Sequence, residues 1–262
     1  MTESLLVERE RAVAIVSIND APYNRMTLDF VDRLEVLVGE IAADDSIRAV
    51  VLTGQGQDNC SVGMNLKQLA DGVQRMGSID KLLDQRLRVI AAIEMMHKPW
   101  IATLFGYCLG GGVEVPLGCH FRLAAAQGAQ IGLPEMDLGS VPAWGGSARL
   151  PRAVGRTHAL DMILRGLKID GEHAYRIGLV SELVPMVELK ARAQALGEEI
   201  AAQPRQAVKS TLDVVVGFET KTLAESLADE GAAVTANRGS ANSLEGMQAF
   251  MEKRKPVFNQ GL

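Results

Sequence analysis

The stretch GYCLGGGVEVPLG, residues 106–118, combines three consecutive glycines with a single acid, Glu114. It follows the apolar run WIATLF, residues 100–105, which is typical of a buried strand. Glycine adopts positive φ readily and lets another group approach the main chain closely. A strand that turns through glycines into a helix leaves N–H groups unpaired, and such donors suit a developing negative charge. The stretch therefore predicts a strand–turn–helix unit, which serves either tight packing or the binding of an anion.

Composition restricts the class of protein. The chain has 262 residues, a net charge of -5, 47% hydrophobic residues and 4% aromatic residues. This balance indicates a soluble globular protein of one or two domains, and it argues against binding to nucleic acid, which needs a basic face. Three cysteines without a CxxC pair and four scattered histidines favour neither a disulfide framework nor a metal site. Since no signal peptide or membrane span is visible, we expect a cytoplasmic protein.

Hydrophobic periodicity divides the chain into two parts. Residues 5–10, 13–18 and 47–54 have strand character, and residues 27–42 have helical spacing with Thr27 as the N-cap. Alternating strands and helices predict an α/β core over residues 1–188. Four helical stretches follow, so residues 189–262 are predicted to form a helical C-terminal part. Residues 69–96 follow no pattern that assigns their structure.

Two further stretches contain glycine-bearing turns. CSVGMNLKQL, residues 60–69, follows a strand and precedes a short helix, which leaves N–H groups free near Met64. IGLPEMDLGSVPAWGGSARL, residues 131–150, places Glu135 between apolar neighbours. Such a glutamate usually caps or pairs with a neighbouring group, but an apolar pocket can also raise its pKa and suit it to proton transfer.

Taken together, SVGMNL, GGGVE, LPE and LGSVP occur in the order and at the spacing of one family. The chain resembles the crotonase, or enoyl-CoA hydratase/isomerase, superfamily over nearly its whole length. The resemblance implies a spiral of repeated β-β-α units with a helical C-terminal part. It also implies a trimer or a dimer of trimers, an acyl-CoA thioester as substrate, no cofactor beyond the coenzyme A of that substrate, and a role in fatty acid metabolism.

The resemblance also implies roles for individual residues. The N–H groups of Met64 and Gly111 would bind the thioester oxygen, while Glu114 and Glu135 would activate water and deliver a proton in an enoyl-CoA hydratase. An isomerase, hydrolase or lyase of the same superfamily is the alternative, and a non-catalytic relative is a more distant one. Coenzyme A would contact Asn24, Arg25, Asn65, Leu66 and Lys67, and a neighbouring subunit would contribute Phe250 and Lys253.

Several positions depart from the common family pattern. Met64-Asn65 stands where an Ala-Asp pair is usual, Cys119-His120 replaces Cys-Asp, and Ala143-Trp144 replaces glycine and a small residue. Trp144 is expected to line or close the acyl site, whereas His120 is expected to be structural. These departures predict a substrate other than simple crotonyl-CoA.

Overall fold

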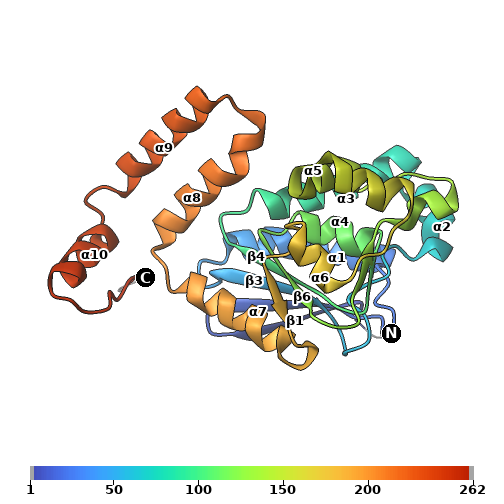
Figure 1. Ribbon diagram of the computed structural model, residues 1–262, viewed down its shortest axis with the longest axis horizontal. Helices are drawn as coiled ribbons and strands as arrows, with labels where there is room; N and C mark the ends of the chain where they lie inside the picture. Colours follow the sequence, from blue (N-terminus) through green and yellow to red (C-terminus); the bar gives the residue numbers. More distant parts are fainter. Residues whose placement is uncertain (1–2, 260–262) are drawn as a thin grey trace.

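The computed structural model describes residues 3–259 and has a sheet at its centre (Figure 1). The strand order is β1 (Leu5–Glu10), β2 (Val13–Ile18), β3 (Ala49–Gly54), β4 (Trp100–Leu104), β6 (Phe121–Ala125) and β8 (Glu182–Val184). Strands β1 and β2 are antiparallel, and the other neighbours are parallel. A second, two-stranded parallel sheet pairs β5 (Tyr107–Leu109) with β7 (Gln130–Gly132). The strands predicted at residues 5–10, 13–18 and 100–105 are thus confirmed.

The helices surround this framework. They are α1 (Leu28–Ala43), α2 (Leu69–Met76), α3 (Ile79–Glu94), α4 (Gly111–Leu117), α5 (Gly146–Leu164), α6 (Gly171–Arg176), α7 (Met186–Ala201), α8 (Arg205–Gly217), α9 (Leu223–Asn237) and α10 (Ala241–Met251). Short 3-10 helices cover η1 (Leu66–Gln68), η2 (Pro134–Leu138) and η3 (Phe218–Thr220). Thr27 caps α1 as predicted, because its side chain accepts the N–H of Phe30.

Strands β2, β3 and β4 of the main sheet are buried on both faces, as expected of parallel strands between helices. Successive residues of β2 belong to different clusters: Val13 packs with α7, whereas Ala14 packs with α1 and α3. The same alternation recurs in β3, where Val51 faces α7 and Val50 faces the opposite side. The two clusters therefore form two apolar layers, and the sheet separates α7 from α1 and α3 (Figure 1).

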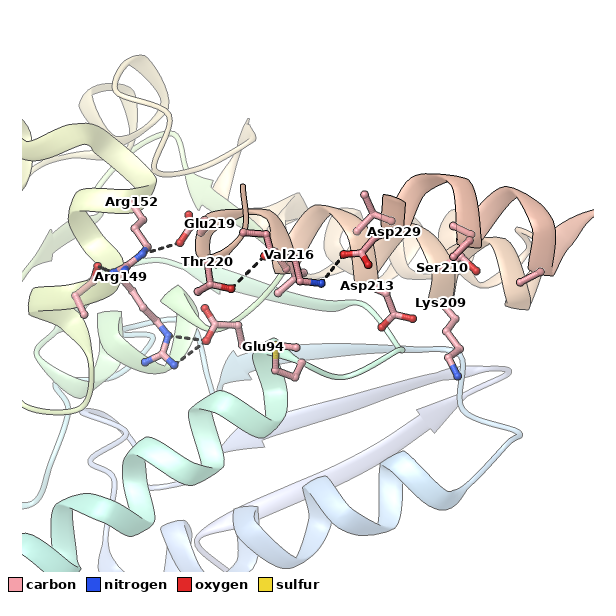
Figure 2. A pocket seen from close by; sticks show the side chains of 18 of the residues that line it. Glu94, Arg149, Arg152, Lys209, Ser210, Asp213, Val216, Glu219, Thr220 and Asp229 are labelled. Carbon is pink, nitrogen blue, oxygen red and sulfur yellow. Dashed lines mark hydrogen bonds and ion pairs between the residues drawn. The ribbon is translucent and has the colours of Figure 1, made fainter. Parts of the chain in front are cut away.

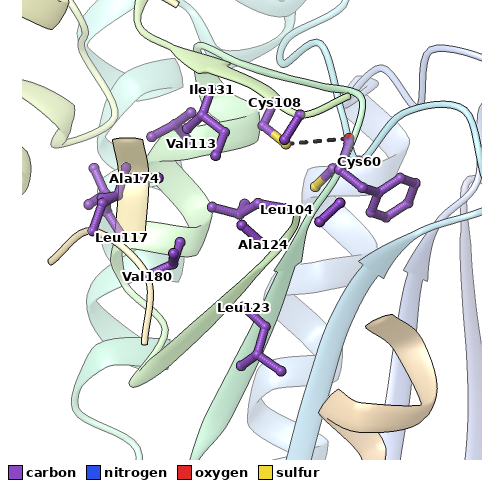
Figure 3. Close-up of a cluster of buried hydrophobic side chains, with 14 of the residues drawn as sticks. Cys60, Leu104, Cys108, Val113, Leu117, Leu123, Ala124, Ile131, Ala174 and Val180 are labelled. Atoms are coloured by element: carbon purple, nitrogen blue, oxygen red, sulfur yellow. Dashed lines mark hydrogen bonds between the residues drawn. The ribbon is translucent and has the colours of Figure 1, made fainter. Parts of the chain in front are cut away.

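Helix α4 is buried along its whole length. Val113 and Leu117 pack with Ile131, Ala174 and Val180 beside the end of the main sheet (Figure 3). The sheet and its neighbours therefore hold the glycine-rich turn, which begins α4, in one position.

The last three helices, α8, α9 and α10, project away from the sheet (Figure 1). Helix α7, in contrast, packs on the sheet, and its Leu189 and Ala193 are fully buried. The division of the chain at residue 188 stays a prediction. In the structure, the helices stop packing on the sheet after α7, and Pro204 begins the first projecting helix, α8.

Helices α2 and α3 occupy the segment that the sequence pattern left unassigned. Ser78 caps α3 by accepting the N–H of Lys81, and Gly77 ends α2 with a positive φ of 85°. The buried positions Leu82, Val89, Ile90 and Ile93 have helical spacing. This signal is present in the sequence, but the charged residues between these positions weaken it.

Candidate active site

The two predicted glycine turns meet at one junction. Gly63 has a φ of +81°, and a Cβ at this position would lie 2.8 Å from the backbone nitrogen of Gly111. A Cβ at Gly112 would overlap the carbonyl oxygen of Ser61. The backbones therefore approach each other more closely than side chains would permit, and this explains why glycine occupies these positions.

This junction leaves two backbone donors unpaired. Met64 forms an isolated parallel bridge with Met26, and that bridge uses the carbonyl of Gly63 and the N–H of Asn65. Gly111 is the first residue of α4, where helical N–H groups have no partner within the helix. Within residues 3–259, the N–H groups of Met64 and Gly111 donate to no protein acceptor. Both are available to an external oxygen.

Glu114 points into the protein from α4 and is only 2% exposed. Its Oε1 accepts hydrogen bonds from the backbone nitrogens of Trp144, at 2.7 Å, and Gly146, at 3.0 Å. Burial raises the pKa of Glu114 to about 7, and the charge of Glu135 adds to the rise, against the opposing effect of the two N–H donors. Glu114 can therefore exchange a proton near neutral pH.

Glu135 lies in η2, beyond the small sheet. A Cβ at Gly110 would lie 2.9 Å from Glu135 Oε1, so the carboxyl group rests against the glycine turn. Its Oε2 is buried and has no hydrogen-bond partner among the described residues. Burial raises the pKa of Glu135 as well. An unpaired, buried carboxyl oxygen is unusual in a folded protein and indicates a group that acts on a ligand.

The structure thus brings four predicted residues to one place: Met64, Gly111, Glu114 and Glu135. The two carboxyl groups interact electrostatically, since Glu135 contributes to the raised pKa of Glu114. Two such groups in a desolvated site do not readily ionise together, so the pair tends to hold one proton between them. Chemically, this arrangement offers one acid, one base and a pair of backbone donors.

Trp144 covers the glycine turn from the side of α1 and α3. It is 5% exposed, and a Cβ at Gly111 would lie 2.7 Å from its indole ring. The guanidinium carbon of Arg86, from α3, lies 5.7 Å from the centre of the Trp144 ring. The tryptophan therefore packs against the glycine turn, and its backbone also holds Glu114. That it lines the acyl site stays a prediction.

Five of the residues predicted to bind coenzyme A lie around the glycine-bearing turn at residues 60–65. Asn24 is fully buried, and its side chain bonds the backbone of Asp20, Gln55 and Asn59. Arg25 forms an ion pair with Asp20, with Nε and Oδ2 2.5 Å apart. Asn65 is half-buried, and Leu66 and Lys67 are exposed in η1, next to the free N–H of Met64. Their contact with coenzyme A stays a prediction, and the side chain of Asn24 is engaged in holding the turn.

Phe250 and Lys253 lie at the end of α10, on the projecting helices and away from α4 (Figure 1). Phe250 is 80% exposed. These two residues therefore lie apart from the glutamate pair of the same chain.

His120 does not face the glutamate pair. Its Nδ1 accepts the backbone N–H of Trp100 at 3.0 Å, and burial lowers its pKa to about 4. It supports the start of β4. Arg86, in contrast, lies beside the site although the sequence did not single it out, because it occurs in the unassigned segment. An arginine at helical spacing from the apolar residues Leu82, Val89 and Ile93 is the signal that could have identified it.

A cavity of about 840 Å³ lies between the core and the projecting helices (Figure 2). Charged pairs line it, including Arg149 with Glu94 and Arg152 with Glu219. Neither Glu114 nor Glu135 lines this cavity. The glutamate pair is therefore separate from this cavity.

Comparison with known proteins identifies the family. The family model described as enoyl-CoA hydratase/isomerase matches residues 8–261. The chain belongs to the enoyl-CoA hydratase/isomerase family, within the crotonase superfamily. It is 32% identical to a probable enoyl-CoA hydratase of Bacillus subtilis over 252 residues, which are 95% of this chain and 96% of that protein. The resemblance drawn from the four motifs is confirmed.

Solved structures of this family have the same fold. DspI of Pseudomonas aeruginosa superposes with a TM-score of 0.92 at 32% identity, covering 98% of this chain and 97% of DspI. An enoyl-CoA hydratase of Bacillus anthracis gives a TM-score of 0.90 at 30% identity, covering 97% and 98% of the two chains. The crotonase-type fold with a helical C-terminal part is thus confirmed. None of the helices in residues 3–259 has the length and apolar character needed to cross a membrane.

Proposed function

We propose that this protein is an enoyl-CoA hydratase, which adds water across the 2,3-double bond of an enoyl-CoA thioester. The observation that carries the proposal is the proximity of the buried Glu114 and the half-buried Glu135, both with raised pKa values, to two unpaired backbone donors. The names of the relatives support the same reaction. The family alone would also accommodate an isomerase, so the assignment rests on the pair of acids.

Each acid has a distinct task in this reaction. One ionised carboxylate accepts a proton from water while the water oxygen attacks C3. The π electrons of the double bond move toward the thioester, and C2 then receives a proton from the partner carboxylic acid. We assign Glu135 as the principal acid/base because its Oε2 is unpaired, and Glu114 as its partner because two N–H groups fix its Oε1.

The N–H groups of Met64 and Gly111 are proposed to hold the thioester oxygen. Negative charge accumulates on this oxygen as water adds, and fixed donors in a dry site stabilise it without reorganisation. The loss of one such donor typically lowers the rate by about 10²- to 10³-fold. The N-terminus of α4, which starts at Gly111, adds the positive end of a helix dipole.

The remaining assignments also belong to the proposal. Coenzyme A is bound by η1 and by the residues around the turn at 60–65, including Asn24 and Arg25. A neighbouring subunit of a trimer or a dimer of trimers supplies Phe250 and Lys253. The exposed apolar side chains of α9 and α10, such as Leu227, Val234 and Met247, support such an assembly. Three buried thiols favour a reducing compartment such as the cytoplasm, and the reaction suits fatty acid metabolism.

An assay of purified protein against 2-enoyl-CoA and 3-enoyl-CoA thioesters tests the reaction type. Hydration adds the mass of one water, isomerisation leaves the mass unchanged, and hydrolysis releases free coenzyme A. Glu114→Gln and Glu135→Gln should each lower kcat/KM for hydration by about 10²- to 10⁴-fold. Glu40→Gln, an exposed change in α1, is the matched control. Wild-type hydration rates in both active-site variants would contradict the assignment. Isomerisation that needs only Glu135 would favour an isomerase.

A further inference from the structure

The space beyond the glycine turn is filled by a protein side chain. The Trp144 indole lies against Gly111 and is packed in a cluster with side chains of α1 and α3. The cavity that remains there has a volume of about 10 Å³. It is lined by Met26, Phe30, Val31, Leu34, Arg86, Val89, Ile90, Val115 and Trp144. A space of this size holds about one water molecule, so it does not accommodate an alkyl chain.

Arg86 holds the indole in this position. The arginine is 2% exposed, and its guanidinium lies over the Trp144 ring. One of its terminal nitrogens donates to the carbonyl of Leu82 at 3.0 Å and to the side chain of Gln85 at 2.6 Å. Its Nε finds no acceptor in the described part of the chain. A desolvated cation gains from the face of an aromatic ring, so movement of Trp144 would remove this contact from Arg86.

Met64, in the glycine-bearing turn at residues 60–65, also fills part of this space. Its side chain is half-buried and packs against the same apolar cluster as Trp144. Met64, which supplies one backbone donor, and Trp144, which packs against Gly111, thus both fill the space between α1, α3 and α4. This filled space adjoins both donors, because Trp144 packs against Gly111 and Met64 packs on the same cluster.

We infer that Trp144 closes the acyl end of the site, with Arg86 as the residue that positions it, and restricts the enzyme to enoyl thioesters with short acyl groups. This inference rests on the proposed hydration for its substrate, but the closure itself is a property of the pocket. Short branched acyl groups belong to the same class, because the closure limits length.

The experiment combines hydration rates with binding. Crotonyl-CoA, tiglyl-CoA, oct-2-enoyl-CoA and dec-2-enoyl-CoA are compared as substrates, while butyryl-CoA and octanoyl-CoA are compared by calorimetric Kd. For the wild type, kcat/KM with oct-2-enoyl-CoA should be at least about tenfold below that with crotonyl-CoA, since methylenes that do not fit cost about tenfold or more. Trp144→Ala should tighten octanoyl-CoA binding by at least about tenfold while leaving butyryl-CoA within about threefold.

Two further variants separate the effect from general loss of core volume. Trp144→Phe and Trp100→Phe make the same change at two buried tryptophans, and only the first should shift the preference toward longer chains. Arg86→Met keeps the stem but removes the cation, so a smaller shift in the same direction is expected. An unchanged length profile in Arg86→Met would remove the positioning role of Arg86.

Equal rates for short and long enoyl thioesters in the wild type would overturn the inference, as would a Trp144→Ala variant with wild-type octanoyl-CoA affinity. If the wild type hydrates no member of the panel, the proposed reaction fails. The ratio of the two Kd values still decides whether Trp144 closes the pocket.

Discussion

The glutamate site and the C-terminal helices differ in the kinds of side chain that they bury and expose. At the site, Glu114 is a carboxyl group that is 2% exposed, and Trp144 is 5% exposed. On the projecting helices every residue of α9 is exposed or half-buried, and Leu223 is 77% exposed. The first region places polar groups in an apolar interior, whereas the second leaves apolar groups in water. The former is typical of a site of reaction, and the latter of a surface that meets another subunit.

Ionisation of Glu114 should have the largest effect on stability. The pKa of this group rises from 4.5 to about 7 on folding, so the folded state binds its proton more tightly than the unfolded state between these values. Stability contributed by protonated Glu114 is therefore lost as pH rises from 4.5 to 7. Because one pKa unit corresponds to about 1.4 kcal/mol, Glu114→Gln should stabilise the protein by about 3 kcal/mol at pH 8 and by little at pH 4.5.

Urea unfolding of the wild type and Glu114→Gln at the two pH values measures this difference.

Glu245, on α10, provides the opposite case. Its ion pair with Arg254 lowers its pKa to about 2, so its contribution to stability is present above pH 4.5 and is lost as pH falls toward 2. If the contributions of Glu114 and Glu245 to the free energy of unfolding changed with pH in the same direction, this contrast between the two regions would be wrong.

Glycines of the two regions should respond in opposite directions to alanine. Gly112→Ala places a Cβ on the carbonyl oxygen of Ser61 and should destabilise the protein by about 2–3 kcal/mol. Gly231→Ala in α9 meets nothing within 4 Å and should stabilise it by about 0.5–1 kcal/mol, since alanine favours the helix. Thermal unfolding of both variants tests the comparison, and a stabilised Gly112→Ala would show that the turns are looser than described.

The smallest effect on the isolated chain is expected at Phe250. Because its side chain is 80% exposed, Phe250→Ala should change unfolding of a single subunit by less than about 0.5 kcal/mol. If a neighbouring subunit covers the ring, the same change should weaken assembly by about 1.5–3 kcal/mol per contact. Sedimentation across a concentration series separates the two cases. Glu40→Gln, an exposed change on α1, serves as the control, and an unaltered assembly would place Phe250 outside the interface.

Much of this architecture was predictable because local signals agree with the fold. The Thr27 cap and the helical spacing after it predict α1, and alternating apolar runs predict β1 to β4. The exception is the segment of α2 and α3, where Gln85 and Arg86 are buried polar side chains that interrupt the apolar stripe. Periodicity alone does not separate such positions from exposed ones, since their burial depends on partners in α1 and on Trp144, which precedes α5.

By itself, the sequence determined the fold class, the family, the two acids and the two glycine-bearing turns, because motif order and residue type carry that information. Tertiary structure alone decided that Glu114 is held by the backbone of Trp144 and Gly146, that Glu135 keeps an unpaired oxygen, and that Arg86 lies over the indole. The physical reason is that pKa values, desolvation and pocket volume depend on groups brought together from distant parts of the chain, and spacing along the chain does not encode their distances.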